Sequence, residues 1–218
     1  MQDYRALRIH RGDDNDFSVA VESVPASTLP DGDILVRVHY SDLNYKDALG
    51  AIGNPGVSRN FPHTPGIDAA GEVVSDSTNQ YRPGDRVLIS GYDFGMNTPG
   101  GLAQYCRVPL QWVCPCPPQL DLPEAMIFGT AGLTAAMCLD KLARLQHKAI
   151  SDTRLLVSGA SGGVGSLATA MAAKLGFQVI AMSGKTQTHD SLRALGATEV
   201  ISSAEWLEPN KKALIKPQ

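Results

Sequence analysis

The sequence predicts an α/β protein built in two parts, a β-rich N-terminal part followed by the first half of a doubly wound parallel sheet. Two observations support this prediction. Residues 1 to about 115 contain several short runs of β-branched residues separated by glycine and proline. From about Pro117 onward, patterns typical of helices and of buried strands alternate, which is the order found in parallel sheets.

The N-terminal part is predicted to contain short strands. Residues 33–40 are rich in β-branched side chains, and residues 71–74, 86–90 and 100–108 are further candidates. The segment 81–85 has turn chemistry, because proline presets φ and glycine tolerates a positive φ. Many short strands with such turns favour a small barrel-like β domain.

The C-terminal part is predicted to alternate helices and strands. A helix opens at about Leu122, with a proline in its first turn, and runs to about Leu145. An amphipathic helix follows a glycine-rich loop and ends at Gly176, since glycine commonly terminates helices. The predicted strands are 154–158, 178–182 and 199–202, and a second short helix covers 191–195.

The bulk properties favour a cytoplasmic globular protein. The 218 residues carry a formal net charge of −3, which argues against a nucleic-acid partner. The weakly apolar run 125–139 is shorter than the ~20 residues that span a bilayer, so no membrane partner is expected. Four cysteines are too few for a disulfide framework. Since Cys114 and Cys116 are too close for a structural zinc and the histidines have no ligand spacing, no metal is predicted.

The glycine-rich loop lies between a predicted strand and a predicted helix. Ala160, Gly162 and Gly165 match the G-x-G-x-x-G spacing, with alanine in the first position. Gly162 would let the backbone approach a pyrophosphate, Gly165 would let the helix pack on the strand, and the helix N-terminus would offer unpaired N–H groups. A plain flexible loop would also use glycine, but the strand–loop–helix context favours a dinucleotide. The predicted contacts are Ala160, Ser161, Gly162, Gly163, Val164 and Gly165.

The residues after the second strand of this sheet indicate which dinucleotide binds. Proteins that bind NAD carry an acidic residue about 20 residues after the loop, where it binds the ribose 2′-hydroxyl. Here Ser183, Gly184 and Lys185 follow the strand, and none of them is acidic. A serine hydroxyl and a lysine cation suit a 2′-phosphate, so these residues predict NADPH. The alternative is that Lys185 is a solvated lysine after a turn.

Several motifs span nearly the whole chain. They are 41–49 (SDLNYKDAL), 59–71 (RNFPHTPGIDAAG), 100–103 (GGLA), 129–132 (GTAG), 158–165 (SGASGGVG) and 183–185 (SGK). In combination they resemble the zinc-free quinone oxidoreductase branch of the medium-chain dehydrogenase/reductase family, closest to its acrylyl-CoA reductase subgroup. Zinc-dependent members carry His and Glu where Ile67 and Asp68 stand here.

The resemblance implies an organisation and an activity. It implies a GroES-like catalytic domain over residues 1–117 and an NADP-binding Rossmann domain over residues 118–218. It also implies a homodimer, and an NADPH-dependent oxidoreductase that delivers hydride to an activated double bond, such as an acryloyl-CoA-like enoyl thioester, or to a quinone. The residues themselves leave the choice between these two substrate classes open.

The resemblance further implies roles for individual residues. Asn44, Tyr45 and Asp68 would lie near the nicotinamide and the substrate, with Asn44 orienting by hydrogen bonds and Tyr45 polarising an oxyanion or supplying a proton. As alternatives, Tyr45 would be a core aromatic, Asn44 a helix cap and Asp68 a structural turn acceptor. Thr130 and Thr134 would contact the cofactor from one helix face, or would bond back to their own helix.

The end of the sequence raises a second hypothesis. Relatives continue through further Rossmann strands, and no fourth strand is predicted after Trp206, so the nucleotide-binding domain is expected to be incomplete at its C-terminus. The alternative function is therefore a truncated, non-enzymatic homologue that binds nucleotide weakly or acts through a partner. The family's homodimer is in doubt for such a chain.

Overall fold

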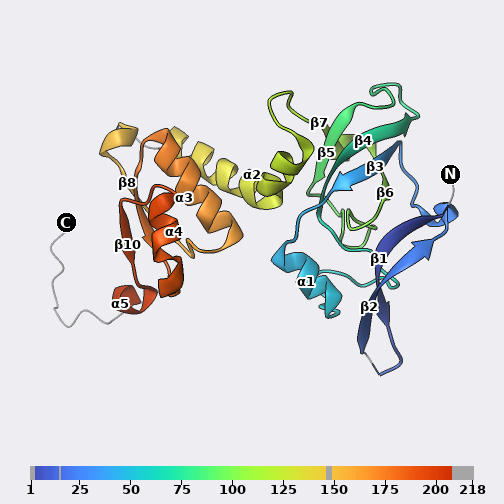
Figure 1. Ribbon diagram of the computed structural model, residues 1–218, viewed down its shortest axis with the longest axis horizontal. Coiled ribbons are helices and arrows are strands. Elements are labelled where there is room, and N and C mark those ends of the chain that lie inside the picture. The colour runs from blue at the N-terminus through green and yellow to red at the C-terminus, as the bar shows by residue number, and fades with distance from the viewer. Residues whose placement is uncertain (1–2, 15, 146–148, 208–218) are drawn as a thin grey trace. The chain divides into compact units, whose positions relative to one another are not determined.

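The computed structural model describes residues 3–14, 16–145 and 149–207. The chain divides into two compact units, residues 1–130 and 131–218 (Figure 1). The first contains antiparallel sheets and the second a parallel sheet, which confirms the predicted α/β class. The domain division predicted at 117–118 stays a prediction. Residues 208–218, where no further strand is predicted, lie outside the described residues.

The first unit is built on a five-stranded antiparallel sheet in the order β6-β3-β4-β5-β7. Its strands are β3 (Ile34–Tyr40), β4 (Asp68–Asp76), β5 (Arg86–Ser90), β6 (Tyr105–Val108) and β7 (Val113–Pro115). Side chains two residues apart, such as Val87 and Ile89 of β5, share one buried core with Ile34 and Val108. The strands predicted at 33–40 and 86–90 are confirmed, and the one predicted at 71–74 is longer in the structure.

The strand predicted at 100–108 begins only at Tyr105. The amide of Gly101 donates to the carbonyl of Gly66 at 2.8 Å, and the amide of Leu102 donates to the carbonyl of Pro65 at 3.0 Å. These bonds tie Gly101 and Leu102 to the loop before β4, and the Leu102 carbonyl accepts the amide of Leu7 at 2.9 Å, so residues 100–104 form no regular strand of the five-stranded sheet. The first part of the predicted strand was therefore wrong.

A hairpin of β1 (Tyr4–Arg11) and β2 (Phe17–Val24) forms a separate two-stranded sheet that the sequence pattern does not predict. Most side chains of β2 are exposed, so the alternating burial typical of a half-buried strand is missing there. Short helical segments join the strands of this unit: η1 (Ala26–Thr28), α1 (Tyr45–Ala51) and η2 (Leu110–Trp112).

Helix α2 (Leu122–Leu145) has the predicted bounds but is broken at Gly129, where φ is 44° and ψ is −151°. Glycine permits this positive φ at no steric cost. Within residues 3–14, 16–145 and 149–207, α2 alone is long and apolar enough to cross a membrane. A core helix fits these data better than a membrane span. The helix is broken at Gly129, and Ala125 and Met126 pack in one buried cluster with Ala70 and Cys116.

The second unit contains a parallel sheet in the order β10-β9-β8, which confirms the predicted start of a doubly wound sheet. Its strands are β8 (Arg154–Ser158), β9 (Gln178–Met182) and β10 (Glu199–Ile201). Its other helical segments are η3 (Ile150–Asp152), α3 (Gly163–Leu175), η4 (Thr186–Thr188), α4 (His189–Ala194) and α5 (Ser203–Leu207). Gly176 ends α3 in the left-handed conformation, as predicted. Leu139 of α2 packs with Ala172 of α3 and Val179 of β9.

Candidate functional site

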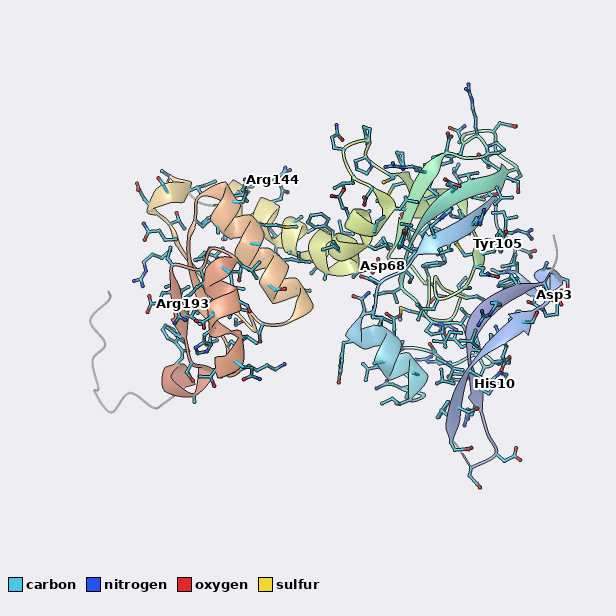
Figure 2. The ribbon with its side chains drawn as sticks, in the orientation of Figure 1. Asp3, His10, Asp68, Tyr105, Arg144 and Arg193 are labelled. Atoms are coloured by element: carbon cyan, nitrogen blue, oxygen red, sulfur yellow. The ribbon has the colours of Figure 1, made fainter. Side chains whose placement is uncertain are left out.

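Asp68, the first residue of β4, is labelled in Figure 2. It lies at the centre of a polar cluster in the first unit. Its side chain is fully buried. Thr130 donates to it twice, from its backbone amide to Oδ2 at 3.0 Å and from its hydroxyl to Oδ1 at 2.8 Å. The side-chain amide of Asn44 donates to Oδ2 at 2.9 Å. Burying a carboxyl group costs free energy unless its oxygens are hydrogen-bonded. The three donors therefore stabilise the buried side chain of Asp68.

Asn44 stands at the N-terminal boundary of α1, beside two carboxyl groups. Its side-chain amide also donates to Oδ1 of Asp42 at 2.6 Å, so both of its hydrogens are used. Its backbone amide donates to Oδ2 of Asp47 at 2.8 Å. The other Asp47 oxygen accepts the amides of Gly66 at 2.9 Å and Ile67 at 3.1 Å. Asp47 thus fastens the start of α1 to the segment before β4, and this connection positions Asn44.

Asp42 brings a second carboxyl group next to Asp68. The pKa of Asp42 is raised from 3.8 to about 7. Burial is the main cause, followed by the charge of Asp68, a hydrogen bond with Asp68 and the charge of Asp47, whereas the hydrogen bond from Asn44 acts in the opposite direction. Burial also raises the pKa of Asp47, although the amides of Asn44, Gly66 and Ile67 act to lower it.

The break in α2 belongs to this cluster. A Cβ atom at Gly129 would lie 2.3 Å from Oδ2 of Asp42 and 3.1 Å from Oδ2 of Asp68, so the close approach of the backbone requires glycine. The next residue, Thr130, is the double donor to Asp68, and the Ser90 hydroxyl lies 3.0 Å from the Thr130 hydroxyl. The helix break therefore places the amide and the hydroxyl of Thr130 within hydrogen-bond distance of Asp68, at the start of β4.

The structure places the other predicted residues of this unit as follows. Tyr45, the first residue of α1, is 80% exposed, which excludes the alternative that it is a core aromatic. Asn44 is the N-cap residue of α1 and forms a capping box with Asp47, which confirms the helix-cap alternative, and its side-chain amide also donates to the carboxyl groups of Asp42 and Asp68. Thr130 bonds to Asp68, which neither sequence hypothesis anticipated. Thr134 is exposed on α2, and its role stays a prediction.

In the second unit, the glycine-rich loop joins β8 to α3 as predicted. Ala160 is fully buried, and its amide donates to the carbonyl of Met182 in β9 at 3.0 Å. The amide of Gly162 closes a turn on the carbonyl of Gly159 at 2.9 Å. A Cβ atom at Gly165 would lie 2.3 Å from that same carbonyl oxygen, so glycine is what lets α3 pack this closely on the loop.

The N-terminal end of α3 fits the pyrophosphate of a dinucleotide. By helix geometry, the amides of Gly163, Val164 and Gly165 have no acceptor within the helix. Gly162, Gly163 and Val164 are exposed, so ligand atoms can approach the backbone. Unpaired amides and the positive end of the helix dipole favour an anion at this position.

The residues predicted to select NADPH follow β9. The Ser183 hydroxyl is buried, donates to the hydroxyl of Ser161 at 3.0 Å and accepts the backbone amide of Lys185 at 3.1 Å. Ser183 therefore links the end of β9 to the glycine-rich loop. Gly184 and Lys185 are exposed, and the Lys185 carbonyl accepts the amide of Thr188 at 2.9 Å. The turn thus presents the Lys185 side chain to solvent.

Sequence reasoning does not identify Asp42, Asp47 or Ser90. A signal exists for Asp47, because asparagine followed three residues later by an acidic residue at a helix start resembles a capping box. Asp42 and Ser90 carry no such signal. Their neighbours in space, Asp68 and Thr130, come from segments far away in the chain.

Known proteins match this chain over most of its length. Residues 30–118 match the alcohol dehydrogenase GroES-like domain. The chain is 40% identical over 217 residues to Bacillus subtilis YhfP, to which a quinone oxidoreductase activity is ascribed, and the match covers 99% of this chain and 64% of YhfP. It is 41% identical over 197 residues to the acrylyl-CoA reductase AcuI of Ruegeria pomeroyi, over 89% of this chain and 59% of AcuI. The chain therefore spans less than two thirds of the length of these relatives.

Solved structures agree with these matches. The crystal structure of Bacillus subtilis YhfP with bound NAD has a TM-score of 0.92 at 38% identity, covering 100% of this chain and 66% of that one. The YhdH oxidoreductase of Salmonella enterica in complex with NADP has a TM-score of 0.90 at 42% identity, covering 94% and 63%. Since sequence and backbone agree over almost all of its residues, the chain carries the alcohol dehydrogenase GroES-like domain and is a homologue, over part of their length, of quinone oxidoreductases and acrylyl-CoA reductases.

Proposed function

We propose that this protein is an NADPH-dependent oxidoreductase that transfers hydride to an activated double bond, such as that of an acryloyl-CoA-like thioester, or to a quinone. The proposal rests mainly on the geometry of the glycine-rich loop. Gly165 packs against the carbonyl of Gly159 with no room for a side chain, while the amides at the start of α3 remain open to an anion. The activities of the relatives support the reaction class.

NADPH, when bound, supplies the hydride, and the chain supplies binding and orientation. Gly162, Gly163 and Val164 would hold the pyrophosphate through backbone amides, and Lys185 would pair with the 2′-phosphate. The NADP complex of the Salmonella relative supports this preference, whereas the Bacillus relative was solved with NAD. The choice therefore rests on the serine, glycine and lysine at 183–185, where NAD proteins carry an acidic residue.

In the first unit, Asn44 and Tyr45 are the groups proposed to meet the reacting molecules. The Asn44 amide is held by two carboxyl groups, so its carbonyl oxygen has a defined direction in which to accept a hydrogen bond. The exposed Tyr45 hydroxyl would donate to the oxyanion that forms when hydride adds to a conjugated double bond, or would supply the proton. Asp68 would act through Asn44.

We also propose that the reaction uses no zinc. Ile67, next to Asp68, is buried and offers no ligand atom where zinc-dependent members carry one. Within the part of the chain that the structure describes, no group of three or more histidine, cysteine, aspartate or glutamate side chains could hold a metal ion. A small-molecule substrate, a cytoplasmic location and a homodimer complete the proposal.

Calorimetric titration with NADPH and NADH tests the cofactor, and NADPH oxidation in the presence of acryloyl-CoA or a simple quinone tests the reaction. We expect NADPH to bind at least about tenfold more tightly than NADH, since one charge-assisted hydrogen bond contributes roughly 1.5–3 kcal/mol. Failure to bind either nucleotide would refute the proposal at its first step. Tighter binding of NADH would refute the cofactor choice alone.

A further inference from the structure

The two carboxyl groups of Asp42 and Asp68 meet at one amide. Asn44 donates one hydrogen to Oδ1 of Asp42 at 2.6 Å and the other to Oδ2 of Asp68 at 2.9 Å. A Cβ atom at Gly129 would lie 2.3 Å from Oδ2 of Asp42 and 3.1 Å from Oδ2 of Asp68, so both carboxyl groups crowd the same point. Burial and the charge of Asp68 raise the pKa of Asp42 to about 7. Because two carboxylates held this close repel each other, the arrangement favours one proton on the pair.

The hydrogen-bond donors around the pair show which group carries that proton. Asp68 is fully buried and accepts three hydrogen bonds, two from Thr130 and one from Asn44, so donors already occupy both of its oxygens. Asp42 accepts one hydrogen bond, from Asn44, and is only half-buried, so its proton can exchange with water. The proton therefore resides mainly on Asp42, which has the single donor Asn44 and is open to water.

The charged groups with the largest effect on Asp42 are both negative, Asp68 from β4 and Asp47 from α1. The neutral Asn44 amide is its hydrogen-bonding neighbour. From α2, the backbone of Gly129 closes in on both carboxyl groups and leaves no room for a side chain to separate them. Loss of the proton would place two carboxylates against one amide. Their repulsion outweighs the stronger hydrogen bond that Asn44 would then make to Asp42, and it would separate the two carboxyl groups that fix Asn44.

We propose that Asp42 is a positioning residue that shares one proton with Asp68 and thereby holds Asn44 in its working orientation. The pair releases that proton to solvent as the pH rises, and Asn44 then loses its fixed direction. The consequence for the reaction rests on the proposed function, in which Asn44 contacts the reacting molecules. The proton sharing itself does not.

Carboxyl-carbon NMR of the complete 218-residue protein, labelled at aspartate and titrated between about pH 5 and pH 9, tests the inference. We expect one aspartate to titrate with a midpoint of about 7, compared with an ordinary value of 3.8. The nitrogen resonance of the Asn44 side-chain amide should move with the same midpoint. A residue with a purely structural role would not couple these two signals.

Two variants complete the experiment. Asp42→Asn should remove the titration near pH 7 and leave the Asn44 signal independent of pH in that range. Asp31→Asn, which changes an exposed carboxyl group of the same unit, should leave both signals as they are. If every aspartate of the unsubstituted protein titrates below about pH 5, or if the step near pH 7 survives in Asp42→Asn, the inference is overturned. NADPH binding measured at the same pH values tests the proposed function separately.

Discussion

Replacing Gly165 with alanine is the most direct perturbation of the nucleotide-binding loop. The new Cβ would lie 2.3 Å from the carbonyl oxygen of Gly159 and 2.8 Å from the Cα of Ala160. Real Cβ atoms essentially never approach closer than 3.0 Å, so α3 and the loop must separate by at least the difference, 0.7 Å. Both obstructing atoms belong to the backbone, so no side-chain rotation can relieve the contact.

The magnitude follows from two opposing terms. Forcing an extra methyl group into a packed site costs typically about 1–3 kcal/mol. Alanine is a better helix former than glycine by up to about 1 kcal/mol, which offsets part of this cost. Gly165→Ala should therefore lower the free energy of unfolding of the second unit by roughly 1–2 kcal/mol. It should weaken NADPH binding as well, because the amides at the start of α3 move away from the pyrophosphate.

Gly163→Ala is the matched control, since it adds the same methyl group two residues earlier in the same helix. Its Cβ would lie 3.6 Å from the Cβ of Ala131, an ordinary contact, so its stability should be unchanged or slightly raised. Because Trp112 lies in the first unit, both variants are made in a Trp112→Phe background, where urea unfolding followed by the fluorescence of Trp206 in α5 reports on the second unit. Equal unfolding midpoints for the two variants would refute the close-packing argument.

Four further predictions concern the cofactor, the chemistry, the metal and the dependence on pH. Lys185→Ala should weaken the binding of NADPH, but not of NADH, by roughly 1.5–3 kcal/mol. Substitution of the exposed Lys174 by alanine should leave NADPH binding unchanged. Calorimetry that shows equal losses of affinity for NADPH and NADH would contradict the 2′-phosphate role. Tyr45→Phe should slow the chemical step more than it weakens cofactor binding, and Tyr92→Phe should do neither; an unchanged single-turnover rate would remove Tyr45 from the reaction. Elemental analysis of active protein should find no stoichiometric zinc, and tightly bound zinc would overturn that expectation. Because the folded protein binds the Asp42 proton more tightly than the unfolded chain, its stability should fall as the pH rises from 3.8 to about 7. Thermal unfolding of Asp42→Asn should show a smaller fall in stability over this pH range. A fall equal to that of the unsubstituted protein would mean that other groups cause it.

Much of the fold could be predicted because its signals are local. The run at 154–158, the loop after it and the helix that ends at Gly176 each carry their pattern within a few residues, and the structure contains them as predicted. The hairpin of β1 and β2 carries no comparable signal, since β2 is mostly exposed. Its formation depends on pairing over its whole length, from Tyr4 with Val24 to Arg11 with Phe17.

The sequence by itself determined the α/β class, the strand–loop–helix suited to a pyrophosphate and the absence of an acidic residue at 183–185, because each of these depends on neighbours in the chain. Tertiary structure alone decided that Asp42 and Asp68 meet at Asn44, and that Thr130 donates to Asp68 from a helix broken at Gly129. The partners of Asp68 come from 24 and 62 positions away. No local pattern encodes such contacts, because burial and charge interaction depend on distance in space, which only the folded chain defines.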